Sequence, residues 1–230
     1  MLTSRSLPLR QRGLSLVELM VGIAVGMFVV AAAATLVTTQ LTENRRLLLE
    51  VQVQQDLRAT ADIITRELRR AGSIAYISDS VGYVWSPGAV WAQNPYMLVN
   101  LTPGPASVVT FESYRTQGSS GPYGFKLEQG IIKSNTAGNW QDLTDRSTME
   151  VTTFSVTSQA QPAIVIACSK LCADLTQSCW PTVTVRAYTV DIVAKSTTDA
   201  SVIRSVRSVV RLKNDRVLSD PALGTSPCPA

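Results

Sequence analysis

The feature that most constrains the fold is a long apolar run, Leu19–Val37, near the N-terminal end of the chain. From Leu14 to Thr42 the only charged residue is Glu18. As an α-helix that rises ~1.5 Å per residue, this run is long enough to cross the ~30 Å hydrocarbon core of a membrane once. A buried core helix is the alternative, but such helices rarely extend so far without a polar face. We therefore expect one membrane-spanning helix.

The basic residues that precede the run predict its orientation. Residues 1–13 hold Arg5, Arg10 and Arg12 and no acid. A basic segment before an apolar run stays in the cytoplasm, so the C-terminal bulk of the chain should be exported. A signal peptide has the same outline, but its apolar region is shorter and ends at a cleavage site with small residues. Here the apolar run continues into a longer helical pattern.

The composition excludes several classes of enzyme. None of the 230 residues is histidine. This removes Ser-His-Asp and Cys-His catalysis and every metal site that contains histidine. No phosphate-binding loop, metal cluster or nucleophile elbow is present either. We expect no catalysis, no cofactor and no metal.

The segment 11–19, with the sequence QRGLSLVEL, resembles the prepilin signature of type IV pilins and pseudopilins. In that superfamily a peptidase removes a short basic leader that ends in Gly, and a Glu lies five residues into the mature chain. The resemblance implies cleavage after Gly13, a new N-terminus at Leu14, and Glu18 as the conserved acid of the signature. The usual first mature residue is an N-methylated Phe, and Leu14 departs from that pattern.

A weaker resemblance extends along the chain to the PilW-type minor pilins. It rests on segments 44–47, 54–58 and 67–72 and on a late strand ending at 210–214. The pseudopilin J component of type II secretion shares much of this pattern. The resemblance implies an α+β, lollipop-like fold, with a long N-terminal helix packed on an antiparallel β-sheet head.

Two interpretations of Glu18 are open. A carboxylate at membrane depth is costly, by roughly 2.5–3.5 kcal/mol on insertion scales. Glu18 lies one residue before the apolar run, so its side chain can reach the aqueous interface. The resemblance instead implies that Glu18 pairs with the positive N-terminus of a neighbouring subunit. Gly22 and Gly26 form a GxxxG pair that would let helices approach closely, although glycine is common in membrane helices.

The helical pattern continues beyond the apolar run and predicts one helix over about 15–71. An apolar stripe recurs at spacings of three and four, at Val53, Leu57, Ala61, Ile64, Leu68 and Ala71. Gly72 is a plausible stop. The expected divisions are a leader (1–13), a membrane and assembly half of the helix (14–42), an amphipathic half (43–72), a β-rich head (73–218) and an irregular tail (219–230). A coiled-coil stem is the alternative for the amphipathic half.

Short β-branched and aromatic runs predict the strands of the head, at 108–111, 125–128, 151–154, 163–166 and 183–185. Gln129-Gly130 predicts a tight hairpin. In the last strand the even positions from Val202 to Leu212 form an apolar face that should lie against the helix. The odd face carries Arg207, Arg211 and Lys213, which either protect a sheet edge or form a partner surface for an acidic subunit or nucleic acid.

Four cysteines, Cys168, Cys172, Cys179 and Cys228, lie in the part of the chain that we expect to be exported. They allow three pairings, and in an oxidising periplasm they should form two disulfides. A zinc site is the alternative, but the spacing lacks paired C-x2-C knuckles. We expect Cys228 to tie the tail to the 168–180 loop, with its partner undetermined.

The resemblance implies a structural subunit that is anchored in the inner membrane, with its head in the periplasm, and is then incorporated into a type IV pilus. It would help to start pilus assembly in a tip complex. The implied partners are other minor pilins, the major pilin, the prepilin peptidase and the inner-membrane assembly platform. The alternatives are a minor pseudopilin of a type II secretion system and a tip adhesin or DNA-uptake module. The net charge of +4 gives little support to nucleic-acid binding, because removal of three arginines with the leader leaves 18 − 17 = +1.

Overall fold

The structure is a computed structural model that describes residues 13, 15–73, 96–113, 121–159, 161–218, 220 and 228–229. Leu14 and nearly all of the expected leader and tail lie outside the described residues. The chain divides into two compact units, Met1–Leu47 and Leu48–Ala230. Each unit is described by itself.

One helix, α1 (Leu16–Arg69), contributes to both units. Ser15 caps its N-terminus, because the Ser15 Oγ accepts a hydrogen bond from the Glu18 backbone N–H at 3.2 Å. The C-terminus is followed by Gly72, whose φ of +75° is the left-handed conformation that glycine adopts without strain. The predicted helix and its stop agree with these bounds to within two residues.

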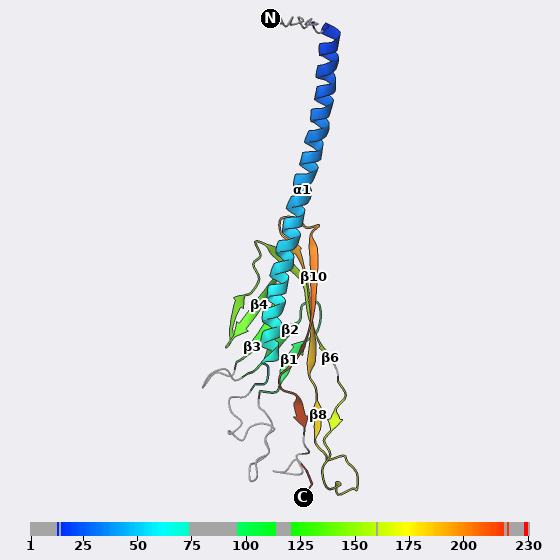
Figure 1. Cartoon of the computed structure of the whole chain (residues 1–230). Coiled ribbons are helices and arrows are strands. Elements are labelled where there is room, and N and C mark those ends of the chain that lie inside the picture. Colours follow the sequence, from blue (N-terminus) through cyan, green and yellow to red (C-terminus); the bar gives the residue numbers. More distant parts are fainter. Residues whose placement is uncertain are drawn as a thin grey trace, which may run out of the picture. The chain divides into compact units, whose positions relative to one another are not determined.

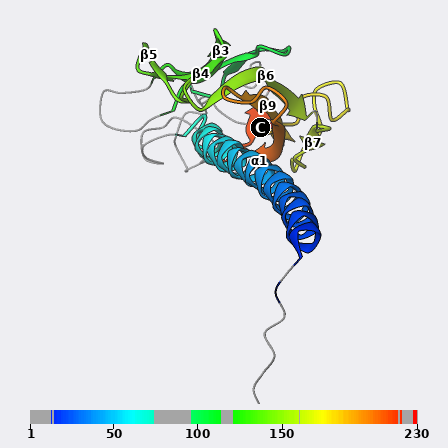
Figure 2. The same cartoon turned by 90° about the horizontal axis from the view of Figure 1, so that it is seen from above.

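In the second unit, residues 48–69 of α1 pack lengthwise on the β-strands (Figures 1 and 2). The predicted apolar stripe forms the contact, and each of its six residues is at most 1% exposed. Thr60 is also buried, and its hydroxyl donates to the Asp56 carbonyl at 2.7 Å. The helix therefore packs against its own head through the stripe.

The described residues of the head form three antiparallel sheets. The first is a meander of β1 (Val99–Thr102), β2 (Val108–Phe111), β3 (Tyr123–Glu128), β4 (Ile131–Thr136) and β5 (Asn139–Asp142). The second has the order β10 (Ile203–Arg211), β9 (Ala187–Ser196) and β6 (Met149–Gln159). The third has the order β11 (Arg216–Leu218), β8 (Thr182–Thr184) and β7 (Ile164–Val165). The expected α+β class with an antiparallel head is confirmed, but the strands are divided among three sheets.

Backbone hydrogen bonds connect the first two sheets around Ser107. The Ser107 N–H donates to the Phe154 carbonyl, and the Phe154 N–H donates to the Pro105 carbonyl, both at 2.8 Å. The Ser107 hydroxyl oxygen accepts from the Val156 N–H at 3.0 Å. The fully buried Ser107 is thus satisfied. These bonds hold the sheets over one core, whose largest members are Phe111, Phe125, Phe154, Leu57, Ile64, Leu68 and Ile132.

The hairpin and the late strand follow the predicted pattern. Gln129 (φ 53°) and Gly130 (φ 78°) join β3 to β4 with two positive φ angles, as a type I′ turn requires. Along β10 the even positions are the less exposed ones, and Val210 and Leu212 join the core that contains the helix stripe. Arg204, also an even position, forms an ion pair with Glu50 of α1.

Two disulfides, Cys168–Cys228 and Cys172–Cys179, are formed. The first ties the expected tail to the end of β7, and the second closes a short loop between β7 and β8. The expected number of disulfides and the attachment of Cys228 to the 168–180 loop agree with the structure, which also identifies Cys168 as the partner.

Candidate assembly surfaces

The N-terminal end of α1 presents the residues of the prepilin-like signature. Gly13 and Ser15 are exposed, and Glu18 occupies the third position of the helix, where its backbone N–H is held by Ser15. A Ser followed three residues later by Glu is the sequence pattern of a capping box. This spacing could have identified Ser15 from the sequence. The negative side chain of Glu18 lies in the first turn, where the helix dipole favours it.

Between Leu19 and Val37, the first unit of the helix presents an apolar surface on all sides. Every described residue from 15 to 47 is exposed, and Phe28 has 80% of its surface exposed. The helix contains a window with a mean hydropathy of 2.4, so it is long and apolar enough to cross a membrane. Thr35, Thr38, Thr39 and Thr42 hydrogen-bond to carbonyls three or four residues earlier. Their hydroxyls therefore need no water, and the surface is suited to lipid or to other helices.

The glycines of the GxxxG pair leave open space on this surface. A Cβ built at Gly22 or Gly26 would meet no heavy atom within 4 Å. Neither glycine is therefore required by packing inside the described part of the chain. Close approach of another helix remains the physical use that such a pair would have.

The basic positions on the odd face of β10 are largely neutralised. Arg207 pairs with Asp191 on β9 at 2.5 Å, and Arg211 pairs with Asp215 at 2.9 Å. The hydrogen bond and charge of Asp191 raise the pKa of Arg207. Lys213 is exposed beyond the end of the strand. The ion pairs leave this strip with less charge to offer a nucleic-acid backbone than the sequence suggests.

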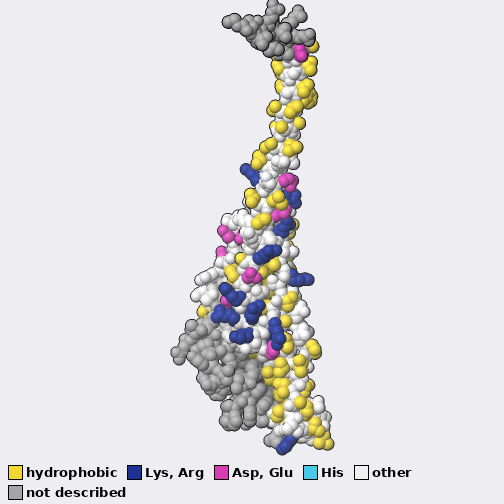
Figure 3. All heavy atoms as spheres, in the orientation of Figure 1, with side chains coloured by type: hydrophobic (Ala, Val, Ile, Leu, Met, Phe, Trp, Pro, Cys, Tyr) yellow, Lys and Arg dark blue, Asp and Glu magenta, His cyan; other side chains and the backbone are white. Residues whose placement is uncertain are grey.

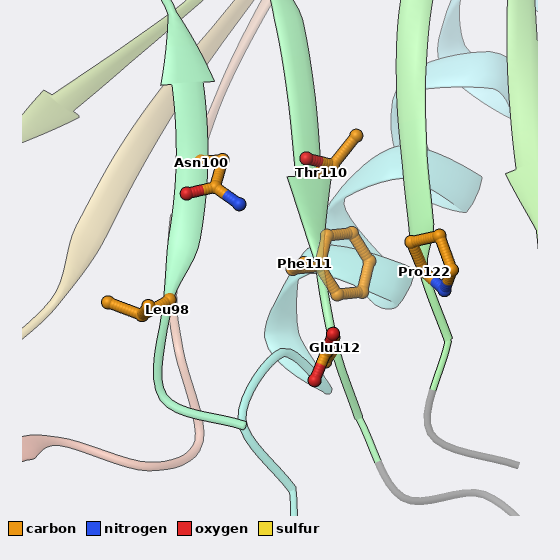
Figure 4. A pocket seen from close by; sticks show the side chains of 6 residues that line it. All are labelled: Leu98, Asn100, Thr110, Phe111, Glu112 and Pro122. Atoms are coloured by element: carbon orange, nitrogen blue, oxygen red, sulfur yellow. The ribbon is translucent and has the colours of Figure 1, made fainter. Parts of the chain in front are cut away.

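The cavity on the outer face of β1, β2 and β3 is small and shallow (Figure 4). Its volume is about 130 Å3, and it is lined by Leu98, Asn100, Thr110, Phe111, Glu112 and Pro122. Ligand sites usually have volumes of ~300–1,000 Å3. Within the described residues there is also no group of three or more acidic or cysteine side chains that could hold a metal ion. The surfaces described above are therefore better candidates for function than this cavity.

Comparison with known protein families finds two matches, in two different parts of the chain. Residues 8–34 match the prokaryotic N-terminal methylation motif, a stretch that includes Gly13, Leu14 and Glu18. Residues 46–212, well over half of the chain, match the family described as prepilin peptidase-dependent protein B.

The chain belongs to the prepilin peptidase-dependent protein B family.

The two matches cover different parts of this family member. The methylation motif extends into the exposed apolar half of α1, from Leu16 to residue 34, while the family match runs from the amphipathic half of α1 through β10. The resemblance to the type IV pilin superfamily is thereby confirmed, and the apolar helix and prepilin motif fit a membrane-anchored pilin. No match was found among curated proteins or among solved structures.

Proposed function

We propose that this family member is a minor pilin of a type IV pilus, a non-catalytic subunit that helps to start pilus assembly in a tip complex. The observation that carries the proposal is the methylation motif at the start of a helix whose apolar surface is wholly exposed. Such a surface needs lipid before assembly and other helices after it. The partners would be other minor pilins, the major pilin, the prepilin peptidase and the inner-membrane assembly platform.

In the proposed mechanism the peptidase cuts between Gly13 and Leu14, and the Leu14 amine of one subunit meets the Glu18 carboxylate of another. Pairing offsets the cost of a carboxylate in a low-dielectric bundle and sets the axial register of the helices. The head would lie in the periplasm, where an oxidising environment suits its two disulfides.

Glu18→Gln tests this mechanism, because it removes the charge and keeps the shape. The variant should enter the membrane normally but be depleted from sheared fibres by about tenfold or more, the effect of losing a partly desolvated ion pair. Glu43→Gln is the matched control, since Glu43 is also an exposed acid of α1 in the same unit. Equal recovery of both variants in fibres would refute the role of Glu18.

The second candidate is a minor pseudopilin of a type II secretion system, which uses the same anchored helix. A deletion strain separates the two. Loss of twitching motility with normal exoprotein secretion supports the pilus, and the reverse supports secretion. A tip adhesin or DNA-uptake module has less support, because Asp191 and Asp215 pair with two of the three cations that suggested it.

A further inference from the structure

A groove of about 330 Å3 runs between α1 and the connection from β5 to β6, within the second unit. Helix residues form one wall, and residues 143–145 and 148–149 form the other. Its lining includes the nearly fully buried Thr60, Thr144 and Met149. Among the described residues, the charged ones that line it are Asp56 on the helix and Asp145 on the connection.

Both carboxylates are suited to receive cations. Within the described residues no Lys or Arg pairs with Asp56, which is half-buried in the groove wall. The Asp145 Oδ1 accepts the Ser147 N–H at 2.7 Å, and this bond lowers the pKa of Asp145. The remaining capacity of both carboxylates is available to donors from outside the chain.

The same helix carries a row of unpaired arginines. Arg58, Arg66 and Arg69 are exposed, and in the described part of the chain none of them pairs with an acid. Neighbouring arginines differ in this respect, since Arg70 pairs with Glu67 at 3.6 Å. Figure 3 shows Lys and Arg side chains gathered over this stretch of the helix and the strands beside it. The helix dipole favours basic residues in the last turn, where Arg66 and Arg69 lie. Arg58 lies outside that turn, so the dipole does not explain the whole row.

The arginine row and the groove lie on different sides of one helix. At ~100° per residue, the row (Arg58, Arg66, Arg69) and the groove side (Gln52, Asp56, Ala59, Ile63) are centred roughly 100° apart. A chain therefore cannot place its own row in its own groove. A second, parallel copy beside it can, because its row would face the groove of the first.

We propose that the groove receives the arginine row of a second copy of this chain. Guanidinium groups would pair with Asp56 and Asp145, and the aliphatic parts of the arginine side chains would pack on Ala59 and Ile63. The contact joins two different surfaces, so a pair of copies keeps one free row and one free groove. The inference deepens the proposed function, on which it rests, because it names a contact between neighbouring helices.

The test uses the full-length chain in detergent and measures self-association by sedimentation over a range of ionic strength. We expect association that weakens as salt rises, whereas association through the apolar half of α1 would not respond in this way. Asp56→Lys and the double variant Arg66→Glu/Arg69→Glu should each weaken self-association by about tenfold or more, since like charges then meet. Arg207→Glu, which alters an arginine already paired on β10, should leave it unchanged.

Mixing the two variants provides the decisive measurement. The Asp56→Lys chain keeps its row and the double variant keeps its groove, so the mixture should regain the association that each variant alone has lost. The two reversed surfaces also carry opposite charges, so the contact can repeat along the mixture. A mixture that stays monomeric, or variants that each associate like the unmodified chain, would overturn the proposal. So would an arginine row that binds single-stranded DNA while the unmodified chain stays monomeric.

The outcomes for the two proposals are separable. If sedimentation shows no self-association through the groove, but Glu18→Gln is still depleted from fibres, this inference alone is refuted. Normal recovery of Glu18→Gln in fibres, with salt-sensitive association of the purified chain, would refute the proposed mechanism and leave the contact standing.

Discussion

Ser15 and Glu18 form one local unit at the start of α1. Cleavage after Gly13 would leave Ser15 as the second residue of the mature chain, so the hydroxyl that holds the Glu18 N–H would be retained. Glu18 would then be stabilised by the dipole of its own helix before it meets the amine of a neighbour. The cap therefore reduces the cost of carrying this carboxylate into an apolar environment.

Gly124 on β3 is a residue whose missing side chain is required. A Cβ at this position would lie 2.3 Å from the Val109 carbonyl oxygen on β2. We predict that Gly124→Ala lowers the free energy of unfolding of the full chain in detergent by about 1–3 kcal/mol or more, because backbone must shift. Urea titration of the head measures the change.

Gly138→Ala is the comparison, because Gly138 has a φ of +92° but no heavy atom within 4 Å of an added Cβ. Gly138→Ala should lower the free energy of unfolding only through backbone strain, by about 1–2 kcal/mol. If Gly124→Ala lowers the free energy of unfolding by less than Gly138→Ala does, crowding between β2 and β3 does not disfavour a side chain at Gly124.

At the scale of elements, the two halves of α1 have different tasks. The apolar half presents side chains to its surroundings, while the amphipathic half supplies one wall of the core of the head. The stripe could be predicted because a 3.6-residue period shows directly in the sequence. The predicted hairpin had an equally local signal, since only a few residue pairs tolerate two positive φ angles.

Leu57 at the centre of the stripe is fully buried. We predict that Leu57→Ala lowers the free energy of unfolding of the head by about 2–5 kcal/mol, through lost burial and a cavity. Val51→Ala is the control, since Val51 is 52% exposed, and it should change the stability by less than ~0.5 kcal/mol. Thermal unfolding followed by circular dichroism measures both, and equal effects would show that the stripe does not support the head.

The arrangement of strands among sheets was less predictable. β9 pairs with both β6 and β10, so its place depends on partners about 40 residues before it and about 15 after it. The ion pair of Arg207 with Asp191 follows from that register and not from a sequence neighbour. For the same reason, the sequence overstated how much free charge β10 offers to a partner.

At the scale of the whole molecule, the two disulfides close loops of different sizes. Cys168–Cys228 spans 60 residues and Cys172–Cys179 spans 7. Four cysteines in a segment expected to be exported predicted two bonds, but spacing alone could not choose among three pairings. The choice agrees with the third sheet, in which β8 pairs with β7, shortly before Cys168, and with β11, the last strand before Cys228.

We predict that replacing Cys168 and Cys228 together with alanine costs about 4 kcal/mol of stability, and replacing Cys172 and Cys179 about 2 kcal/mol, from loop-closure entropy. Urea unfolding of both double variants under oxidising conditions measures the difference. A larger loss for the 7-residue loop would contradict this explanation and would indicate that packing around the buried Cys172 and Cys179 matters more.

The Cys168–Cys228 bond also determines how the head would respond to mechanical load. A pull between α1 and Cys228 passes through the backbone only as far as Cys168 and then crosses the disulfide. The backbone from 169 to 227, which includes β8, β9, β10 and β11, lies outside that covalent force path. Force applied in this way cannot unzip β10 from β9, so the part of the core that they form is shielded for as long as the bond stays oxidised.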